Sequence, residues 1–332
     1  MTSKFLKKVL LLALVISTVY GVGRLYYRIT DGFLEENIQF DLPYDSRWES
    51  PALSVEKKNE IDAILAQEFY YLGKGCQSYV FRSQDDKYVI KFFKYQRFKP
   101  QSWLSAFTFI PAVDNYQLQK KDLKKQKLDY LFSSWKLSYD ELQPETGVLY
   151  VNLNKNSNLW DKLIVYDKMG LKHELQLDSL EFMLQKKANM LCPELLRLKS
   201  NNDLAACEEL VDNLLAMLLS EYQRGFADND HALMQNTGVF DQKPIHIDVG
   251  QFVRNSIASD PRVYSQELFN KMWKFRIWLA QEYPELAQYT QESLKMAIGP
   301  SFDKLTPQLN KASMGRIPYG GVSLGKPVMC PR

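Results

Sequence analysis

One lysine, Lys91, stands inside an otherwise apolar run at residues 88–93. The β-branched and aromatic side chains of this run predict a β-strand. A charged amine in such a strand costs free energy unless an anion meets it, and a nucleotide phosphate is one such anion. The alternative is a lysine at the edge of an ordinary glycine-rich hairpin.

Two glycines precede the lysine strand. Gly73 and Gly75 lack a Cβ and so allow the backbone to approach a ligand closely. Alternation over residues 78–82 predicts another strand, and residues 84–87 have the composition of a tight turn. In a dinucleotide-binding loop the glycines open a helix, and in a Walker A loop the lysine follows them directly. Neither arrangement occurs here, because a strand and a turn separate the glycines from the lysine.

Acidic and amide side chains gather in two later stretches. Asp228, Asp230 and Asn236 follow a predicted amphipathic helix, and Asp248 ends a short apolar run. Carboxylate and amide oxygens are hard ligands that suit Mg²⁺. Each stretch considered alone could equally be a polar turn, so the interpretation depends on the two occurring together and downstream of the glycines.

In this order along the chain, the features resemble the protein kinase-like superfamily. Its Gly-x-Gly-x-x-Gly-x-Val loop is matched by Gly73, Gly75 and Val80, with Ser78 in place of the third glycine. Its Val-Ala-Ile-Lys strand is matched by residues 88–91. The match covers roughly residues 56–290 through short motifs. No Ala-Pro-Glu motif follows, which makes the chain more similar to atypical and small-molecule kinases than to regulated protein kinases.

The resemblance implies ATP as a ligand and Mg²⁺ as its companion. It implies that Lys91 binds the α- and β-phosphates under a glycine loop. The loop residues so implied are Gly73, Lys74, Gly75, Ser78 and Val80.

It also implies roles for the acidic stretches. Asp248 and Asn236 would hold Mg²⁺, and Asp230 would orient or deprotonate an acceptor hydroxyl, with Asp228 as a rival base. Asn236 stands six positions after Asp230, whereas the family places its asparagine five after, where this chain has Gln235.

Two further family features differ or stay open. Asp-Val-Gly at residues 248–250 replaces Asp-Phe-Gly and keeps the carboxylate. In kinases a helix carboxylate pairs with the strand lysine. Asp129, Asp140 and Glu141 are the candidates, and the sequence does not choose among them.

The N-terminal 29 residues predict a membrane segment. Three lysines precede a fifteen-residue apolar run at residues 9–23. We expect an uncleaved single-pass anchor, with a cleaved signal peptide as the alternative. Lysines before the span favour a cytoplasmic N-terminus, but Arg24 and Arg28 weaken that asymmetry, so the side of the membrane stays open.

Composition narrows the class. The 332 residues are 45% hydrophobic and 24% charged, as in ordinary folded proteins. With 42 Lys and Arg against 39 Asp and Glu, the net charge of +3 gives no reason to expect a nucleic-acid partner. Four scattered cysteines without a Cys-x-x-Cys pair predict neither a zinc site nor a disulfide scaffold. His246, between two isoleucines, is expected to be a hydrogen-bonded core residue.

The expected fold is α+β and two-lobed, kinase-like. A juxtamembrane linker or packing arm would occupy residues 30–55 and a loop-like C-terminal tail residues 306–332. A small antiparallel β N-lobe with one long helix would occupy residues 56–184. A mainly α-helical C-lobe would occupy residues 185–305.

The first functional hypothesis is a membrane-anchored phosphotransferase that moves the γ-phosphate of ATP to a hydroxyl acceptor. Its partners would be a nucleotide and, through the N-terminal segment, membrane lipid; the acceptor could be a protein, a lipid head group or a sugar. The second is a catalytically weak pseudokinase that acts as a membrane-tethered scaffold. The third is an unrelated α+β envelope protein whose motifs are coincidental.

Overall fold

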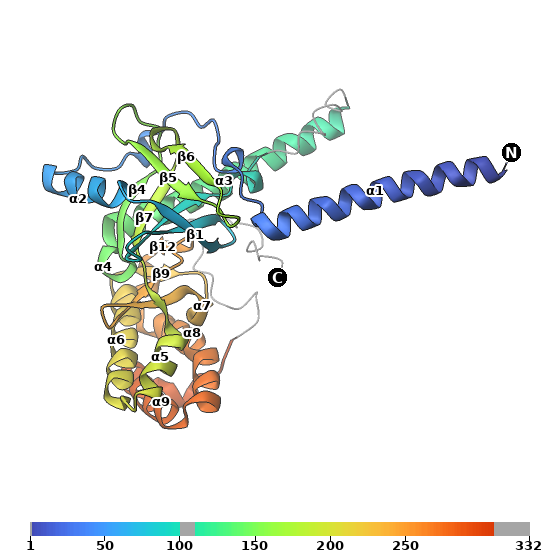
Figure 1. Ribbon diagram of the computed structural model, residues 1–332. Coiled ribbons are helices and arrows are strands. Elements are labelled where there is room, and N and C mark those ends of the chain that lie inside the picture. The colour runs from blue at the N-terminus through green and yellow to red at the C-terminus, as the bar shows by residue number, and fades with distance from the viewer. Residues whose placement is uncertain (1, 100–109, 309–332) are drawn as a thin grey trace. The chain divides into compact units, whose positions relative to one another are not determined.

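Helices and β-strands both make up large parts of the computed structural model, which describes residues 2–99 and 110–308 and confirms an α+β fold (Figure 1). The elements group into two units. Unit 1 contains residues 1–99 and 152–182, and unit 2 contains residues 100–151 and 183–332. The aromatic stretch at residues 103–109 and the tail from residue 309 onward lie outside the described residues.

Unit 1 begins with α1 (Thr2–Thr30), a long helix that extends away from the strands of its unit (Figure 1). Its segment Phe5–Thr30 has a mean hydropathy of 1.9 and is long and apolar enough to cross a membrane. The side chains of residues 5–29 are exposed and Thr30 at the end of the segment is buried, whereas a core helix would bury its apolar side chains. A signal sequence would share the length and composition of α1.

The sheet strands of unit 1 follow the order β3-β2-β1-β5-β6. Antiparallel pairs join β1 to β2, β2 to β3 and β5 to β6, but β1 and β5 are parallel. The sheet is therefore mixed, where the sequence predicted an antiparallel one. A parallel pair needs a long crossover, and here many residues separate the two strands. The strands are β1 (Phe69–Lys74), β2 (Ser78–Ser83), β3 (Tyr88–Phe93), β5 (Lys162–Tyr166) and β6 (Lys172–Gln176).

The segment after α1 packs on this sheet. The Phe33 ring meets Tyr79 and Phe81 edge to face, with centroid distances of 5.3 and 5.1 Å. Ile38 and Trp48 are also buried. Residues 31–54 therefore form a packing arm, one of the two alternatives that the sequence left open. It contains η1 (Glu35–Asn37) and η2 (Ser46–Trp48) and leads to α2 (Val55–Leu65), and η3 (Tyr95–Arg97) and η5 (Leu177–Ser179) complete the unit.

Unit 2 is largely helical. Its core is built from the leucine-rich face of α6, packed against α8 and α9. Asp203 caps α6 by accepting a hydrogen bond from the Ala206 amide. The helices are α3 (Pro111–Glu141), α4 (Gln143–Thr146), α5 (Leu191–Ser200), α6 (Leu204–Gln223), α7 (Leu233–Asn236), α8 (Pro261–Glu282) and α9 (Pro284–Ile298), followed by η7 (Gly299–Lys304).

Short strands complete unit 2. The β10–β11 hairpin turns through Asp241 and Gln242, both with positive φ, as a two-residue hairpin loop requires. The strands are β8 (Asn189–Met190), β9 (Phe226–Asp228), β10 (Thr237–Phe240), β11 (Lys243–His246) and β12 (Phe252–Arg254), with η6 (Ser256–Ser259) after them. The neighbouring strands β4 (Val148–Asn152) and β7 (Phe182–Lys186) lie where the chain passes between the units.

Candidate functional site

The glycine loop of unit 1 joins β1 to β2. Gly75 N donates to Ser78 O at 2.9 Å and closes the turn. A Cβ placed at Gly73 would meet nothing within 4 Å, and one at Gly75 would meet only the Ser78 hydroxyl at 3.9 Å. Packing of side chains inside the described structure therefore does not demand glycine here. The strand register shifts between Tyr71 and Gly73, which is a place where glycine is common, and the open space beside both glycines leaves room for a ligand to approach the backbone.

Strand register places Gly73, Val80 and Lys91 in one row. Gly73 pairs with Val80 across β1 and β2, and Val80 pairs with Lys91 across β2 and β3. Residues directly opposite one another present their side chains on the same face of a sheet. Lys91 is 8% exposed. The lysine and the loop that the sequence singled out thus share one region of unit 1.

Two basic residues that the sequence did not single out donate hydrogen bonds to backbone carbonyls of the glycine loop. Lys94 Nζ donates to Gly75 O at 2.7 Å and lies 4.8 Å from the centre of the Tyr79 ring. Arg97 donates to Cys76 O. Lys94 follows β3 directly and Arg97 ends η3, and a lysine at the end of an aromatic strand was the available signal in the sequence. Cys76 is disulfide-bonded, whereas Cys192 and Cys207 are free thiols.

The loop carries an excess of positive charge. Burial, together with the nearby charges of Lys74 and Arg97, lowers the pKa of Lys94 to about 8. Among the described residues, no carboxylate lies within salt-bridge distance of Lys94; Lys74, by contrast, is paired with Asp31 at 2.9 Å. A buried cation that lacks a counter-charge is stabilised when an anion binds beside it.

In unit 2, hydrogen bonds bring the acidic stretches together. Asn229 N donates to Gln251 O at 3.1 Å, and Ile247 N donates to Asn236 O at 2.8 Å. The segment 247–251, which carries Asp248, is therefore joined at one end to the loop of Asp230 and at the other to Asn236. The three side chains come from a region that the β9–β12 and β10–β11 pairs jointly position.

Asp228 and Asp230 have different environments. The Asp228 carboxylate accepts from Lys271 Nζ of α8 at 2.7 Å, and both side chains are almost fully buried. Its other oxygen accepts from the Asp230 amide at 3.0 Å. Asp230 is half-buried and accepts from the Ala232 amide at 2.9 Å. The geometry makes Asp228 a residue that shapes the loop and leaves Asp230 nearer to solvent.

Helix α8 holds the loop at a second point. His231 Nε2 lies 2.8 Å from Glu267 Oε2, and Glu267 precedes Lys271 by one helical turn. The distant histidine, His246, meets Glu221 of α6 at 2.8 Å, with both side chains buried. The expectation of a hydrogen-bonded core histidine is confirmed.

The residues suggested for Mg²⁺ occupy different depths. Asn236 is 8% exposed and its Nδ2 is buried without a hydrogen-bond partner, whereas Gln235 is exposed. Asp248 is exposed, and its Oδ1 accepts from the Gly250 amide at 3.1 Å. Nδ2 is a hydrogen-bond donor, so its lack of a partner fits an acceptor, such as a phosphate or water oxygen, bound beside it, whereas a metal would be held by the amide oxygen Oδ1.

Few protein ligands are present there. The described residues contain no group of three or more His, Cys, Asp and Glu side chains arranged to hold a metal. Mg²⁺ commonly takes one or two protein oxygens and fills its remaining positions with phosphate and water. Asp248 and Asn236 fit that mode.

Helix α3 positions the segment 247–251, which carries Asp248. Ser134 Oγ donates to Val249 O and accepts from the Phe252 amide at 2.6 Å. The Tyr130 hydroxyl lies 3.1 Å from Gln251 O. Of the helix carboxylates considered as partners of Lys91, Asp140 pairs with Lys136 at 3.0 Å and Glu141 pairs with Arg254, all within unit 2.

Comparisons with known proteins give a loose likeness. No protein-family model and no curated protein matches the chain. One solved structure of the bifunctional kinase-methyltransferase WbdD is 14% identical, with a TM-score of 0.33, over 70% of this chain and 44% of that one. A second WbdD structure is 16% identical, with a TM-score of 0.32, over 66% and 44%. The chain spans less than half the length of WbdD, and likeness at this level identifies neither a family nor an activity.

Proposed function

We propose that this protein is a membrane-anchored, kinase-like phosphotransferase that moves the γ-phosphate of ATP to a hydroxyl acceptor with Mg²⁺. The observation that supports it most is the pair of hydrogen bonds that joins the segment 247–251 to Asn229 and to Asn236. They gather Asp230, Asn236 and Asp248 in unit 2. A carboxylate base beside hard metal ligands is what phosphoryl transfer requires.

Each residue has a chemical role in the proposal. Asp230 accepts the proton of the acceptor hydroxyl, because its loop holds it near solvent and its neighbour Asp228 is paired with Lys271. Asp248 and Asn236 hold Mg²⁺, which when bound neutralises charge on the phosphates.

Unit 1 supplies the phosphate-binding groups. Lys91 and Lys94 provide positive charge, and the backbone from Gly73 to Ser78 provides amides that approach the phosphates closely. The low pKa of Lys94 supports an anionic ligand, because burial and like charges oppose its protonation until an anion binds. The α1 anchor favours an acceptor at the membrane.

A nucleotide-binding scaffold without turnover is the second candidate. The extra residue between Asp230 and Asn236 and the serine at position 78 favour it, because both depart from the spacing and glycine pattern of active kinases. Binding and turnover must therefore be measured separately.

The binding test compares thermal unfolding of the wild type, Lys91→Ala and Asp248→Ala with and without ATP and Mg²⁺. A ligand at a hundred times its Kd stabilises the folded state by about 2.7 kcal/mol. We expect this gain in the wild type and its loss in both variants. Lys295→Ala, at an exposed ion pair with Asp303, is the control that should keep it. A wild-type melt unchanged by saturating nucleotide would refute the proposal.

The turnover test uses Asp230→Asn. Loss of a general base typically lowers the rate by about 10²–10⁴-fold. We expect that loss with nucleotide binding retained. Turnover that survives in Asp230→Asn but vanishes in a folded Asp228→Asn variant would assign the base to Asp228. Nucleotide binding without turnover in the wild type would refute the phosphotransferase and favour the nucleotide-binding scaffold.

A further inference from the structure

Three large apolar side chains are exposed at one end of the unit 1 sheet. Leu72, near the end of β1, is 49% exposed; Met169 and Leu171, in the turn between β5 and β6, are 51% and 55% exposed. Single exposed apolar residues are ordinary, but a group on neighbouring strands marks a binding surface. We call Leu72, Met169 and Leu171, with Lys74 and Lys168, the tip surface.

Strand direction brings the tip surface together. β1 and β5 are parallel, with Tyr70 opposite Tyr166 and their rings stacked at 5.0 Å. Because both strands run the same way, the end of β1 and the turn that follows β5 emerge at the same edge of the sheet.

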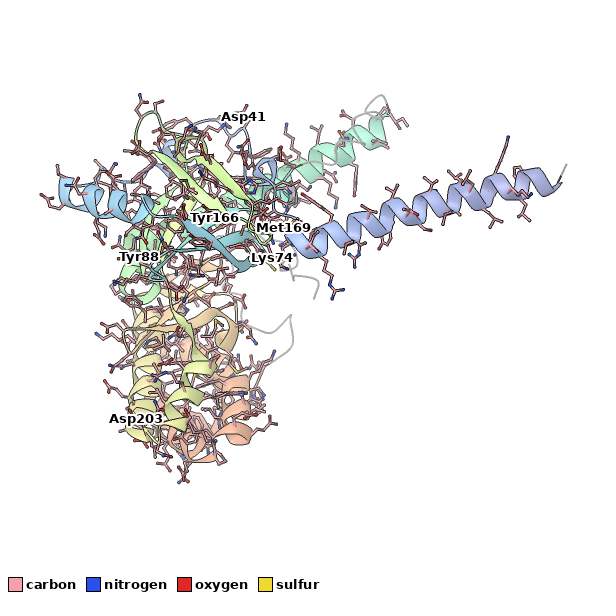
Figure 2. All side chains as sticks on the ribbon, viewed as in Figure 1. Asp41, Lys74, Tyr88, Tyr166, Met169 and Asp203 are labelled. Atoms are coloured by element: carbon pink, nitrogen blue, oxygen red, sulfur yellow. The ribbon has the colours of Figure 1, made fainter. Side chains whose placement is uncertain are left out.

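The last turn of α1 is fastened to this edge. Asp31 directly follows the helix and pairs with Lys74 at 2.9 Å and with Lys168 at 3.1 Å. The Tyr71 hydroxyl donates to the same carboxylate at 3.0 Å. Figure 2 shows the labelled Lys74 and Met169 beside the C-terminal end of α1.

Two more contacts reach into the helix itself. Lys168 Nζ donates to the Arg28 carbonyl at 3.2 Å, and Lys74 Nζ lies 4.2 Å from the centre of the Tyr27 ring. Partial burial raises the pKa of Asp31, but the side-chain hydrogen bonds that its carboxylate accepts from Lys74, Lys168 and Tyr71 lower it, and the net shift is downward. The tip surface and the end of α1 therefore form one charged junction.

The length of α1 would place the junction at the surface of the bilayer that this helix spans. The 26-residue apolar segment of α1 has a length of about 39 Å at 1.5 Å per residue. This exceeds a hydrocarbon core of about 30 Å, so its last residues reach the head groups. Tyrosine and arginine are common in the head-group region of a membrane, and the last turns of α1 carry Arg24, Tyr26, Tyr27 and Arg28.

Charge complements this placement. Lys74 and Lys168 share the single carboxylate of Asp31, and Arg24 and Arg28 add two cations on α1. Lys172, also in this turn region, pairs with Glu174 at 3.3 Å. Basic side chains beside a membrane span attract anionic head groups.

We propose that the tip surface rests in the interface of an anionic bilayer, with Leu72, Met169 and Leu171 inserted among the head groups. The proposal rests on the membrane anchor of the proposed function. It places the glycine loop, in which Lys74 lies, at the membrane face, so the attachment of α1 and the nucleotide loop share residues.

The test is photo-crosslinking of the full-length chain to lipid. A photoreactive amino acid is placed singly at Leu72, Met169 or Leu171, and the protein is reconstituted in phosphatidylcholine–phosphatidylglycerol vesicles. Leu14 in α1 reports insertion of the span, and Val55 at the start of α2, 71% exposed, reports background. We expect lipid adducts at Leu14 and at all three tip positions, and none at Val55.

The outcomes separate the two proposals. Adducts at Leu14 without adducts at the tip positions would overturn the tip surface while the anchor stands. No adduct at Leu14 would remove the anchor and the tip surface together. A second variant, Met169→Asp with Leu171→Asp, should lower the adduct yield at Leu72 several-fold and leave Leu14 unchanged; an unchanged yield at Leu72 would also contradict the proposal.

Discussion

Two buried lysines, one in each unit, have opposite surroundings. Lys271 of unit 2 is 2% exposed and lies 2.7 Å from the carboxylate of Asp228. Lys94 of unit 1 is 6% exposed and donates to the Gly75 carbonyl at the same distance. One charge is neutralised inside the fold, whereas the other faces a carbonyl dipole, an aromatic ring and two further cations.

The difference indicates what each lysine does. A buried ion pair holds two segments in one arrangement, and removal of one partner leaves an uncompensated charge. Lys271 therefore fixes the Asp228 loop on α8. A buried cation without a carboxylate beside it destabilises the ligand-free protein, and an anion that binds next to it removes that destabilisation. Lys94 is accordingly the better candidate for a ligand contact.

The largest expected effect is on the paired lysine. Lys271→Met leaves Asp228 buried without its cation and should lower the free energy of unfolding by about 3–5 kcal/mol, measured by chemical denaturation. Lys295→Met, at an exposed pair, should change it by no more than about 1 kcal/mol. Asp228→Asn combined with Lys271→Met should recover part of the loss. Equal effects of Lys271→Met and Lys295→Met would contradict the stabilising role assigned to the Asp228–Lys271 pair.

Lys94→Met should act on ligand binding rather than on the fold. The methionine keeps most of the side-chain volume and removes the unpaired charge, so we expect a change in unfolding free energy within about 1 kcal/mol. Loss of a charged hydrogen bond to phosphate should weaken ATP binding by about 1.5–3 kcal/mol, measured by calorimetry. Lys74→Met is the matched control, with a smaller loss, because Lys74 already pairs with Asp31. Destabilisation by Lys94→Met as large as that by Lys271→Met would contradict the distinction.

The smallest expected effect is a pH dependence. Because the pKa of Lys94 falls from 10.5 to about 8 on folding, the unfolded chain binds more protons than the folded protein between these values. Lys94 should therefore contribute stability that rises with pH across that window, whereas the Cys192 and Cys207 thiols, whose pKa burial raises to about 11, contribute in the opposite direction from about pH 9. Denaturation of the ligand-free wild type and of Lys94→Met at a series of pH values should show a slope that is less positive in the variant. An identical slope in the variant would mean that Lys94 keeps its ordinary pKa.

Local patterns in the sequence predicted much of unit 1 and of the helices. Alternation identified β2, and the β-branched and aromatic composition of residues 88–93 identified β3 with Lys91 inside it. The Asp203 cap of α6 was also predictable, because a cap bonds to a backbone amide only a few residues away. The parallel β1–β5 pair was not, since it joins segments nearly a hundred residues apart.

The residues that the sequence did not single out all contact groups that lie well upstream of them in the chain. Lys94 and Arg97 act through carbonyls of the glycine loop, and Lys271 and Glu267 act through a loop tens of residues upstream. In a helical pattern a lysine predicts a solvent-facing position. Only the packing of α8 against the Asp228 loop converts Lys271 into a buried partner.

By itself, the sequence determined which side chains could do chemistry: glycines before a strand lysine, and carboxylates and an amide after a long helix. It also determined an apolar N-terminal helix, because hydrophobicity and spacing are local properties. The tertiary structure alone decided that Asp228 is paired, that Lys94 lies beneath the glycine loop and that α1 is bound to the tips of two strands. Charge pairing depends on distances in space, and those distances follow from the packing of segments remote in the chain.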